Sequence, residues 1–208
     1  MNFEAYDFSA AGLYHERLCL DFVNSTGQHD DPAADHLRSY ADLLAWSLDV
    51  SLLTPAGADG LYAQAQASPA EAAAVFAHAV KLRDALFAVL SNAAIQQPPP
   101  PAALATFNES LGEAMRHMRL NAGETDAHWA WVYRPNDLAQ MLGPVVWSAV
   151  EVLQSADRAD LRVCEGHDCD WMFLDTSRNH SRRWCSMQSC GNRAKAKRHY
   201  HRGRAASE

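Results

Sequence analysis

Apolar residues recur every three to four positions along several stretches of the chain, a spacing that predicts amphipathic helices. We expect a first helix to begin at Asp35, whose carboxylate can cap its first turn. A longer helix should begin within SPAE, where Ser68 can cap, Pro69 suits the first helical position and Glu71 completes a capping box. One side of this helix should lie on a core. The apolar stripe on that side comprises Val75, Ala79, Leu82, Leu86 and Val89 or Leu90.

Two further helices are predicted in the second half of the chain. Four consecutive prolines at 98–101 interrupt the pattern and favour a stiff, extended linker. Helical spacing resumes over residues 104–115 and again over residues 137–156. Because Gly143 and Pro144 fall inside the last segment, we expect a kink or a break there.

Other segments alternate between apolar and polar residues, as β-strands do. The sequence RLCLDFVNSTG, residues 17–27, predicts a short apolar strand that runs into a polar turn. Alternation around a glycine-containing turn at 116–134 predicts a hairpin in which Trp129 and Trp131 share one face. Residues 171–175 predict another short strand. The body is therefore expected to be α+β, mostly helical with a small antiparallel sheet.

The overall composition indicates a globular protein. With 208 residues, of which 48% are hydrophobic, the chain can bury a substantial core. It contains no stretch of about 18 uncharged apolar residues, so no membrane contact is expected. Its first residues lack the basic and apolar regions of a secretory signal. We therefore expect a cytoplasmic protein, in which cysteines stay reduced.

Four of the five cysteines form two pairs of equal spacing near the C-terminal end. Cys164 and Cys169 are one C-x4-C pair, Cys185 and Cys190 are the other, and fifteen residues separate the pairs. Four thiolates in this arrangement can complete a tetrahedral shell around Zn²⁺. A filled shell leaves no open position, so we predict one structural zinc ion. Its binding would contribute about 10 kcal/mol to the folding of a segment with few core residues.

The sequence allows other uses of these residues. The C-x4-C spacing lies at the upper end of the usual range for zinc sites, and a redox or disulfide pair is the alternative. His167 is either a substitute ligand or an exposed loop residue. We expect the aromatic residues Trp171, Phe173 and Trp184 to form an apolar wall beside the metal, rather than to stack on bases.

The net charge of −7 is distributed unevenly. Residues 1–175 carry 9 Lys and Arg against 24 Asp and Glu, whereas residues 176–204 carry 9 Lys and Arg and no acid. An acidic body with a basic end often accompanies contact with nucleic acid, and a solvated cationic surface is the alternative. The sequence RAKAKRHYHR favours a helix that could lie along a phosphate backbone or enter a major groove. The expected DNA contacts are Arg178, Arg182, Arg183, Arg193, Lys195, Lys197, Arg198 and Arg202.

The body offers one candidate ligand site. Asp21, Asn24 and Thr26 follow the predicted first strand and could line a pocket for a small-molecule effector. The alternative is a turn in which Asn24 and Thr26 bond nearby backbone groups. We do not expect an enzyme, because the sequence holds no phosphate-cradling glycine loop, no HExxH and no GxSxG motif.

The tetrapeptide CGNR at 190–193 follows both cysteine pairs, DTSRN at 175–179 and RRWC at 182–185. In these features residues 160–204 resemble the CGNR zinc finger family. The preceding part is similar to the ABATE domain, a stress-induced transcription regulator, in LDFVNST at 20–26, in LRDAL at 82–86 and in the tryptophan-bearing hairpin. The resemblance implies a zinc-bound, DNA-binding module attached to an N-terminal sensing or regulatory domain.

We therefore predict two domains: residues 1–158 as the ABATE-like regulatory domain and residues 159–208 as the four-cysteine zinc finger that ends in a basic helix. The expected function is transcription regulation, in which the finger binds DNA and the body senses a ligand or mediates assembly. A homodimer would gain affinity from two half-sites. The alternative function is a protein-interaction adaptor whose finger docks a protein partner or its own acidic body.

Overall fold

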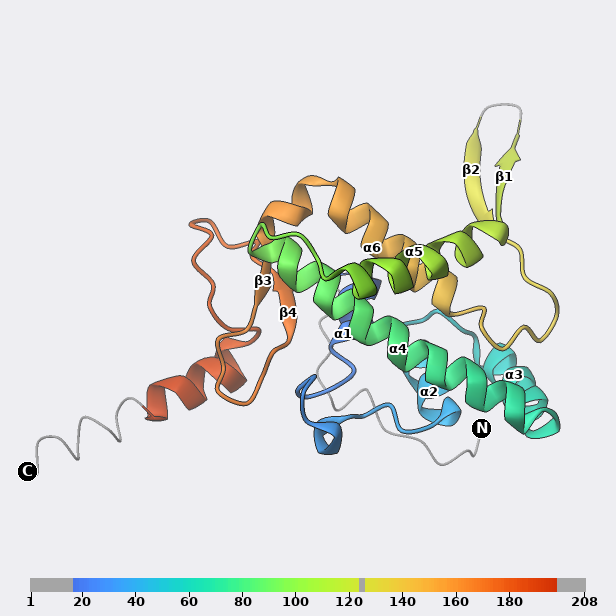
Figure 1. Cartoon of the computed structure of the whole chain (residues 1–208), viewed down its shortest axis with the longest axis horizontal. Coiled ribbons are helices and arrows are strands. Elements are labelled where there is room, and N and C mark those ends of the chain that lie inside the picture. Colours follow the sequence, from blue (N-terminus) through green and yellow to red (C-terminus); the bar gives the residue numbers. More distant parts are fainter. Residues whose placement is uncertain (1–16, 124–125, 198–208) are drawn as a thin grey trace, which may run out of the picture.

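A helical body carries a smaller C-terminal module in the computed structural model, which describes residues 17–123 and 126–197 (Figure 1). The helices are α1 (Leu18–Val23), α2 (Tyr40–Asp49), α3 (Pro55–Ala67), α4 (Pro69–Ala94), α5 (Pro101–Arg116) and α6 (Leu142–Gln154), with short 3-10 turns η2 (Pro32–Ala34) and η3 (Ala156–Asp160). The strands form two antiparallel pairs, β1 (Met118–Ala122) with β2 (Ala127–Trp131) and β3 (Leu161–Val163) with β4 (Met172–Leu174). This architecture confirms the predicted α+β class. In the described part of the chain, every helix is too short or too polar to cross a membrane.

The longest helix, α4, lies at the centre of the body. It contacts the other five helices of the body and reaches β3 of the C-terminal module. The helices α5 and α6 also pack on each other. Its apolar stripe faces the core as predicted, with Leu82 and Leu86 fully buried. The helix begins at Pro69 as predicted, but Ser68 makes no capping hydrogen bond. The Ser68 hydroxyl instead accepts a hydrogen bond from Gln64 Nε2 at 3.3 Å.

The segment predicted as a strand at 17–27 contains the helix α1 instead, so that prediction was wrong. Residues 19–23 are all buried, because α1 packs against α4, α6 and β4. A helix that is buried on every side has no polar face, and its sequence then resembles the apolar run of a buried strand. Within it, Cys19 is a packing residue, and burial raises the pKa of its thiol to about 12.

The helix expected to begin at Asp35 begins later, at Tyr40. Its cap is Ser39, whose hydroxyl accepts a hydrogen bond from the N–H of Asp42 at 3.2 Å. The carboxylate of Asp35 is used elsewhere, since it pairs with the guanidinium of Arg83 at 2.6 Å. The Arg83 side chain is only 4% exposed, and a buried cation needs such a partner.

Two connections also differ from the sequence pattern. The proline run joins α4 to α5, which pack directly against each other, and Pro101 is the first residue of α5. α6 begins at Leu142, so Pro144 lies in its first turn, where a missing N–H costs no hydrogen bond and causes no kink. The helix α3 was not predicted. Over Pro55–Ala67 the buried positions are mostly alanines, which give a weak apolar pattern.

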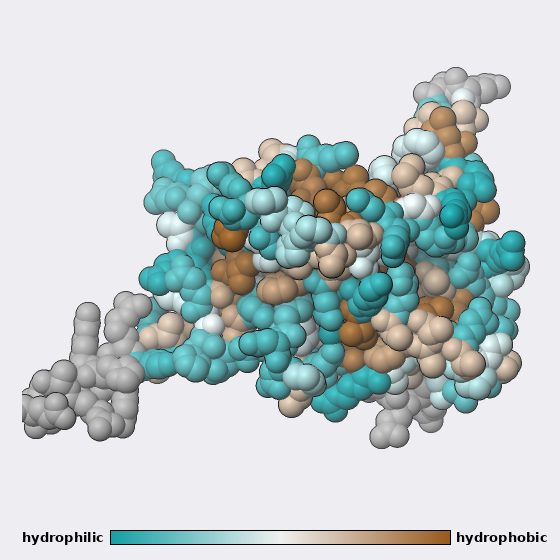
Figure 2. All heavy atoms as spheres, viewed as in Figure 1, coloured by the Kyte–Doolittle hydropathy of each residue, from teal (hydrophilic) through white to brown (hydrophobic). Residues whose placement is uncertain are grey.

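The predicted hairpin is present and projects from the body (Figure 1). In its register, Leu120 lies opposite Trp129 and Met118 lies opposite Trp131. These four side chains share one face, since alternate residues of a strand point the same way. The body covers the base of this face, whereas Leu120 and Trp129 nearer the tip are 57% and 58% exposed. Figure 2 shows hydrophobic residues among more polar ones on the projecting arm.

Candidate metal centre

The short strands and one helical turn position the four paired cysteines. Cys164 directly follows β3, and Cys169 precedes β4. Cys185 lies just before the π-helical turn η4 (Met187–Gly191), and Cys190 lies within it. The antiparallel pairing of β3 and β4 thus brings Cys164 and Cys169 close together, and the segment at η4 places Cys185 and Cys190 next to them.

The four sulfur atoms converge on one point. The Sγ atoms of Cys164, Cys169, Cys185 and Cys190 all lie within 4.8 Å of one another. Cys185 Sγ is 3.7 Å from the Sγ atoms of both Cys169 and Cys190. A tetrahedral zinc ion with Zn–S bonds of about 2.3 Å holds its sulfurs about 3.8 Å apart, whereas a disulfide requires about 2.05 Å. All four cysteines are free thiols, so the geometry is consistent with one structural zinc ion and not with a disulfide.

Hydrogen-bond donors surround these sulfur atoms. The backbone N–H groups of Cys185 and Gly166 donate to Cys164 Sγ at 3.3 and 3.4 Å. The guanidinium of Arg193 donates to Cys190 Sγ at 3.0 Å. Four thiolates around Zn²⁺ leave a net charge of about −2, which such donors stabilise. Hydrogen bonds from the thiols of Cys169 and Cys185 lower the pKa of Cys164, whereas the bonds to Cys164 raise the pKa of both partners. Without the metal, the first proton is therefore lost from Cys164, and the metal is needed to deprotonate the others.

The loop between the first two cysteines fits closely around the centre. A Cβ atom at Gly166 would lie 3.2 Å from Cys190 Sγ and 3.3 Å from Cys164 Sγ, so any larger residue would press on the ligands. His167, the alternative ligand, is exposed and bonds to the carboxylate of Asp168. The structure therefore favours an exposed loop residue at this position.

Aromatic side chains pack beside the cysteines, as expected of an apolar wall. Phe173 is 1% exposed, and Trp171 and Trp184 pack against the cluster while partly buried. The Arg182 guanidinium lies 4.4 Å from the centroid of the Phe173 ring. It also donates hydrogen bonds to the carbonyl oxygens of Trp184, at 3.0 Å, and of Cys185. Arg182, predicted to contact DNA, is thus used to hold the loop that carries a metal ligand.

Two more of the predicted DNA contacts interact within the module. Arg183 Nε lies 2.7 Å from Glu165 Oε2, and its guanidinium carbon lies 5.3 Å from the centroid of the Trp184 ring. The side chains of Arg183 and Glu165 are 57% and 50% exposed, so water screens the attraction between them. Arg193 is exposed but directed at a ligand sulfur. These two cations are therefore oriented by the fold rather than free to rearrange.

The remaining predicted contacts that the structure describes are on the surface. These remaining contacts are Arg178, Lys195 and Lys197, and all three side chains are exposed. Both lysines lie in the helical segment 192–197, which continues directly from η4 and hence from the metal centre. Arg198 and Arg202 lie outside the described residues. The start of the predicted basic helix is therefore confirmed, and it is anchored at the fourth cysteine.

The predicted ligand residues lie where the body meets the finger. Asp21, Asn24 and Thr26 are 4%, 2% and 1% exposed. The Asn24 amide donates to the carbonyl of Met172 and accepts from its N–H, both at 2.8 Å. The indole N–H of Trp171 donates to the carbonyl of Thr26. This geometry favours a structural role at the junction over a ligand pocket, and no local sequence signal points to partners so distant in the chain.

Comparison with known families agrees with this division into body and finger. Residues 161–203 match the family model of the CGNR zinc finger. Residues 16–156 match the ABATE family model, which is described as "Putative stress-induced transcription regulator". No match was found among the curated proteins. Since the second match extends over more than half of the chain, the protein belongs to the ABATE family and carries a CGNR zinc finger after its helical body.

Proposed function

We propose that the protein regulates transcription by binding DNA through its CGNR finger, while the body senses an effector and joins two copies. The proposed role is binding rather than catalysis. The observation that carries it is the position of Lys195 and Lys197, exposed on a helical segment that starts at the metal centre. A helix fixed in this way can meet phosphates with little loss of conformational entropy.

The charge distribution supports the same surface. Residues 176–204 hold 9 cations and no acid, whereas residues 1–175 hold an excess of acidic residues. A polyanion is therefore repelled by the body and attracted by the finger. Arg178 adds another exposed cation, which lies between the two cysteine pairs. The shape of the finger depends on zinc, so the orientation of these cations should depend on it as well.

Fluorescence anisotropy with duplex DNA at several salt concentrations tests this proposal. With about five phosphate contacts, the logarithm of the binding constant should fall by about 4.5 per tenfold rise in salt. Replacing both lysines, Lys195→Ala and Lys197→Ala, should weaken binding and reduce this slope by about 2. The matched control is Lys81→Ala, which removes an exposed lysine from α4 and should leave binding unchanged.

Binding that is absent, or that does not respond to salt, would contradict the proposal. Equal affinity of the double variant and the Lys81→Ala control would place the DNA surface elsewhere. Failure to bind any duplex would instead favour the protein adaptor. In that case the intact protein should capture a partner through the same two lysines.

We further propose that the hairpin joins two copies. On its apolar face, the exposed side chains of Leu120 and Trp129 lie side by side. Within the two strands, at 118–122 and 127–131, this face carries no charged residue. A lone two-stranded hairpin is marginally stable in water, so a covered face would stabilise it. A second copy offers an identical uncharged face, and a twofold axis brings the two together without like-charge repulsion.

Analytical ultracentrifugation tests the dimer. The variant Leu120→Ser with Trp129→Ser should sediment as a monomer at concentrations where the unmodified protein is a dimer, because the shared apolar contact is lost. The control is Asn121→Ser with His128→Ser, which alters the adjacent register pair on the opposite face of the hairpin. A monomeric unmodified protein, or a dimer that survives the first variant, would show that the hairpin does not join two copies.

A further inference from the structure

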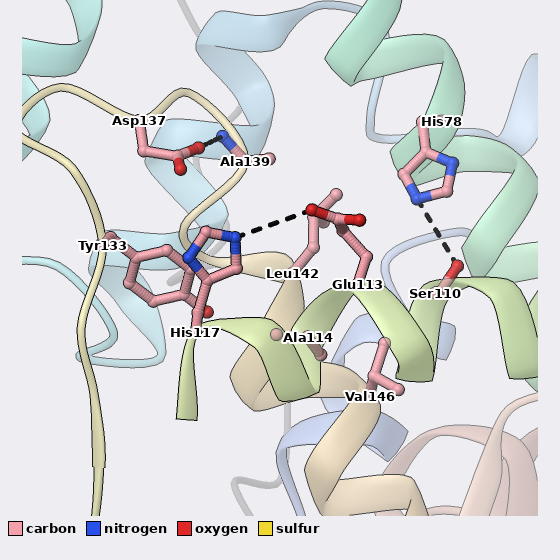
Figure 3. A pocket seen from close by; sticks show the side chains of 11 residues that line it. His78, Ser110, Glu113, Ala114, His117, Tyr133, Asp137, Ala139, Leu142 and Val146 are labelled. Atoms are coloured by element: carbon pink, nitrogen blue, oxygen red, sulfur yellow. Dashed lines mark hydrogen bonds and ion pairs between the residues drawn. The ribbon is translucent and has the colours of Figure 1, made fainter. Parts of the chain in front are cut away.

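A cavity of about 130 Å³ lies between α4, α5, the start of α6 and the segment after the hairpin. Figure 3 shows its two walls, with His78 on one side and His117 and Tyr133 on the other. Its residues come from four separate parts of the chain, so the closed fold is needed to assemble it. It is distinct from the zinc site and from the junction that holds Asn24.

Polar groups line the walls. His78 Nε2 lies 3.4 Å from the hydroxyl of Ser110, and His117 Nε2 lies 3.7 Å from Glu113 Oε1. The carboxylate of Asp137 lines the same cavity and accepts a hydrogen bond from the N–H of Ala139 at 3.0 Å through one oxygen. The side chains of Ala114, Leu142 and Val146 supply apolar surface. Such a mixture of apolar surface with a few polar groups is typical of a small-molecule site.

The hydroxyl of Tyr133, which lines this cavity, is a buried polar group. It makes no hydrogen bond with any residue that the structure describes. It lies against the backbone of Gly143, where a Cβ atom would come within 2.2 Å of it. An unpaired buried hydroxyl destabilises the fold, and a ligand that bonds to it would recover that cost.

The charges and rings of the cavity favour a positive ligand. Two carboxylates, those of Glu113 and Asp137, line it, and the described lining includes no lysine or arginine. Because Glu113 also pairs with Arg116 outside the lining, Asp137 supplies most of the attraction for a cation. Burial, with a further contribution from Asp137, raises the pKa of the Tyr133 hydroxyl, which therefore stays neutral. The Tyr133 ring stacks on His117, with ring centroids 4.6 Å apart. Carboxylates and aromatic faces both attract organic cations.

We propose that this cavity binds a small organic cation, namely a primary ammonium compound with about the bulk of benzylamine. The cavity is slightly smaller than an apolar cavity of about 150 Å³ that accommodates benzene, so it holds the ring while the ammonium group lies at its edge, where the Glu113 side chain is 59% exposed. The ammonium group would lie near Asp137 and Glu113, and the apolar part would contact Leu142 and Val146. The inference rests on the proposed sensing role of the body but does not require DNA binding.

The position of the cavity suits an effector site. Leu142 and Val146 belong to the first turns of α6, and the end of the same helix leads through η3 to β3 of the finger. A ligand that alters the packing of α6 can therefore act on the module that carries the metal.

Isothermal titration of the full-length, zinc-loaded protein with benzylammonium chloride, without DNA, tests the inference. Benzyl alcohol and benzoate, of similar shape, serve as the neutral and anionic probes. We expect benzylammonium to bind at least about tenfold more tightly than either, because charge-assisted hydrogen bonds are stronger than neutral ones. Equal affinity for the alcohol, preference for benzoate, or no binding of benzylammonium would each overturn the inference, whether or not the protein binds DNA.

Two variants locate the site. Asp137→Asn keeps the oxygen that accepts from Ala139 and removes the charge, so benzylammonium affinity should fall about tenfold. Glu109→Gln, an exposed change elsewhere on α5, should leave affinity unchanged. Tyr133→Phe removes the unpaired hydroxyl, so the free protein should unfold at the same or a higher temperature while affinity falls. If Asp137→Asn and Glu109→Gln bind equally well, the cation does not occupy this cavity.

Discussion

At the scale of single residues, Asn24 joins the body to the finger. Its amide forms both a donor and an acceptor hydrogen bond with the backbone of Met172, the first residue of β4. Met172 is 1% exposed, so water cannot replace these bonds. One side chain thus satisfies a strand edge that would otherwise be buried without partners.

The variant Asn24→Ala should therefore destabilise the protein strongly. It leaves the buried N–H and carbonyl of Met172 without partners, and we expect the free energy of unfolding in urea to fall by about 3 kcal/mol. Asn108→Ala, which changes an exposed asparagine on α5, should alter it by less than about 0.5 kcal/mol. Equal stability of the two variants would show that the junction does not depend on Asn24.

The difference between the cysteines and Asn24 shows what single residues reveal in a sequence. The four metal ligands were predicted, because sulfur chemistry and regular spacing are visible without the fold. The role of Asn24 was not, since its partner is 148 positions away in the chain. Arg182 was assigned to DNA on charge alone, whereas the structure places it on Phe173 and on loop carbonyls.

At the scale of elements, α6 meets the base of the hairpin at Gly143. A Cβ atom there would lie 2.2 Å from the Tyr133 hydroxyl and 2.9 Å from Cζ3 of Trp131. The two rings stack on each other, with centroids 6.0 Å apart, so a Cβ atom would have to displace both of them. Close approach, rather than a turn, thus explains glycine near the start of this helix.

Gly143→Ala should consequently destabilise the protein, by about 1–3 kcal/mol, through overpacking. Gly112→Ala is the matched control, because a Cβ atom at this exposed position of α5 meets nothing within 4 Å. Alanine should there stabilise the helix by about 0.5–1 kcal/mol. Thermal unfolding measures both changes, and a shift of the same sign in the two variants would be evidence against the close packing at Gly143.

The elements themselves were predicted with uneven success, for physical reasons. The amphipathic α4 and the alternating hairpin have one polar face each, and the sequence pattern located both. The helix α1 is buried on every side and α3 buries mainly small residues, so neither carries the periodic pattern that predicts a helix.

At the scale of the whole molecule, one chain combines an acidic helical body with a small module whose own core is slight. Apart from the cysteines, the buried cluster of this module contains only Phe173, with Trp171 and Trp184 partly buried against it, as far as the described residues show. Metal binding therefore accounts for the shape of the module better than apolar packing does. Its docking through Asn24 and Trp171 then fixes the basic segment relative to the body.

In the function that we propose, zinc bound by the four cysteines shapes the surface that contacts DNA. The most direct measurement is anisotropy of labelled duplex DNA with zinc-loaded protein, repeated after removal of the metal by a chelator and again after zinc is restored, with zinc content determined in each sample. We expect one zinc per chain, with salt-sensitive binding that is lost on chelation and regained with the metal. Unchanged DNA binding by protein without zinc, or loaded protein with no stoichiometric zinc, would contradict it.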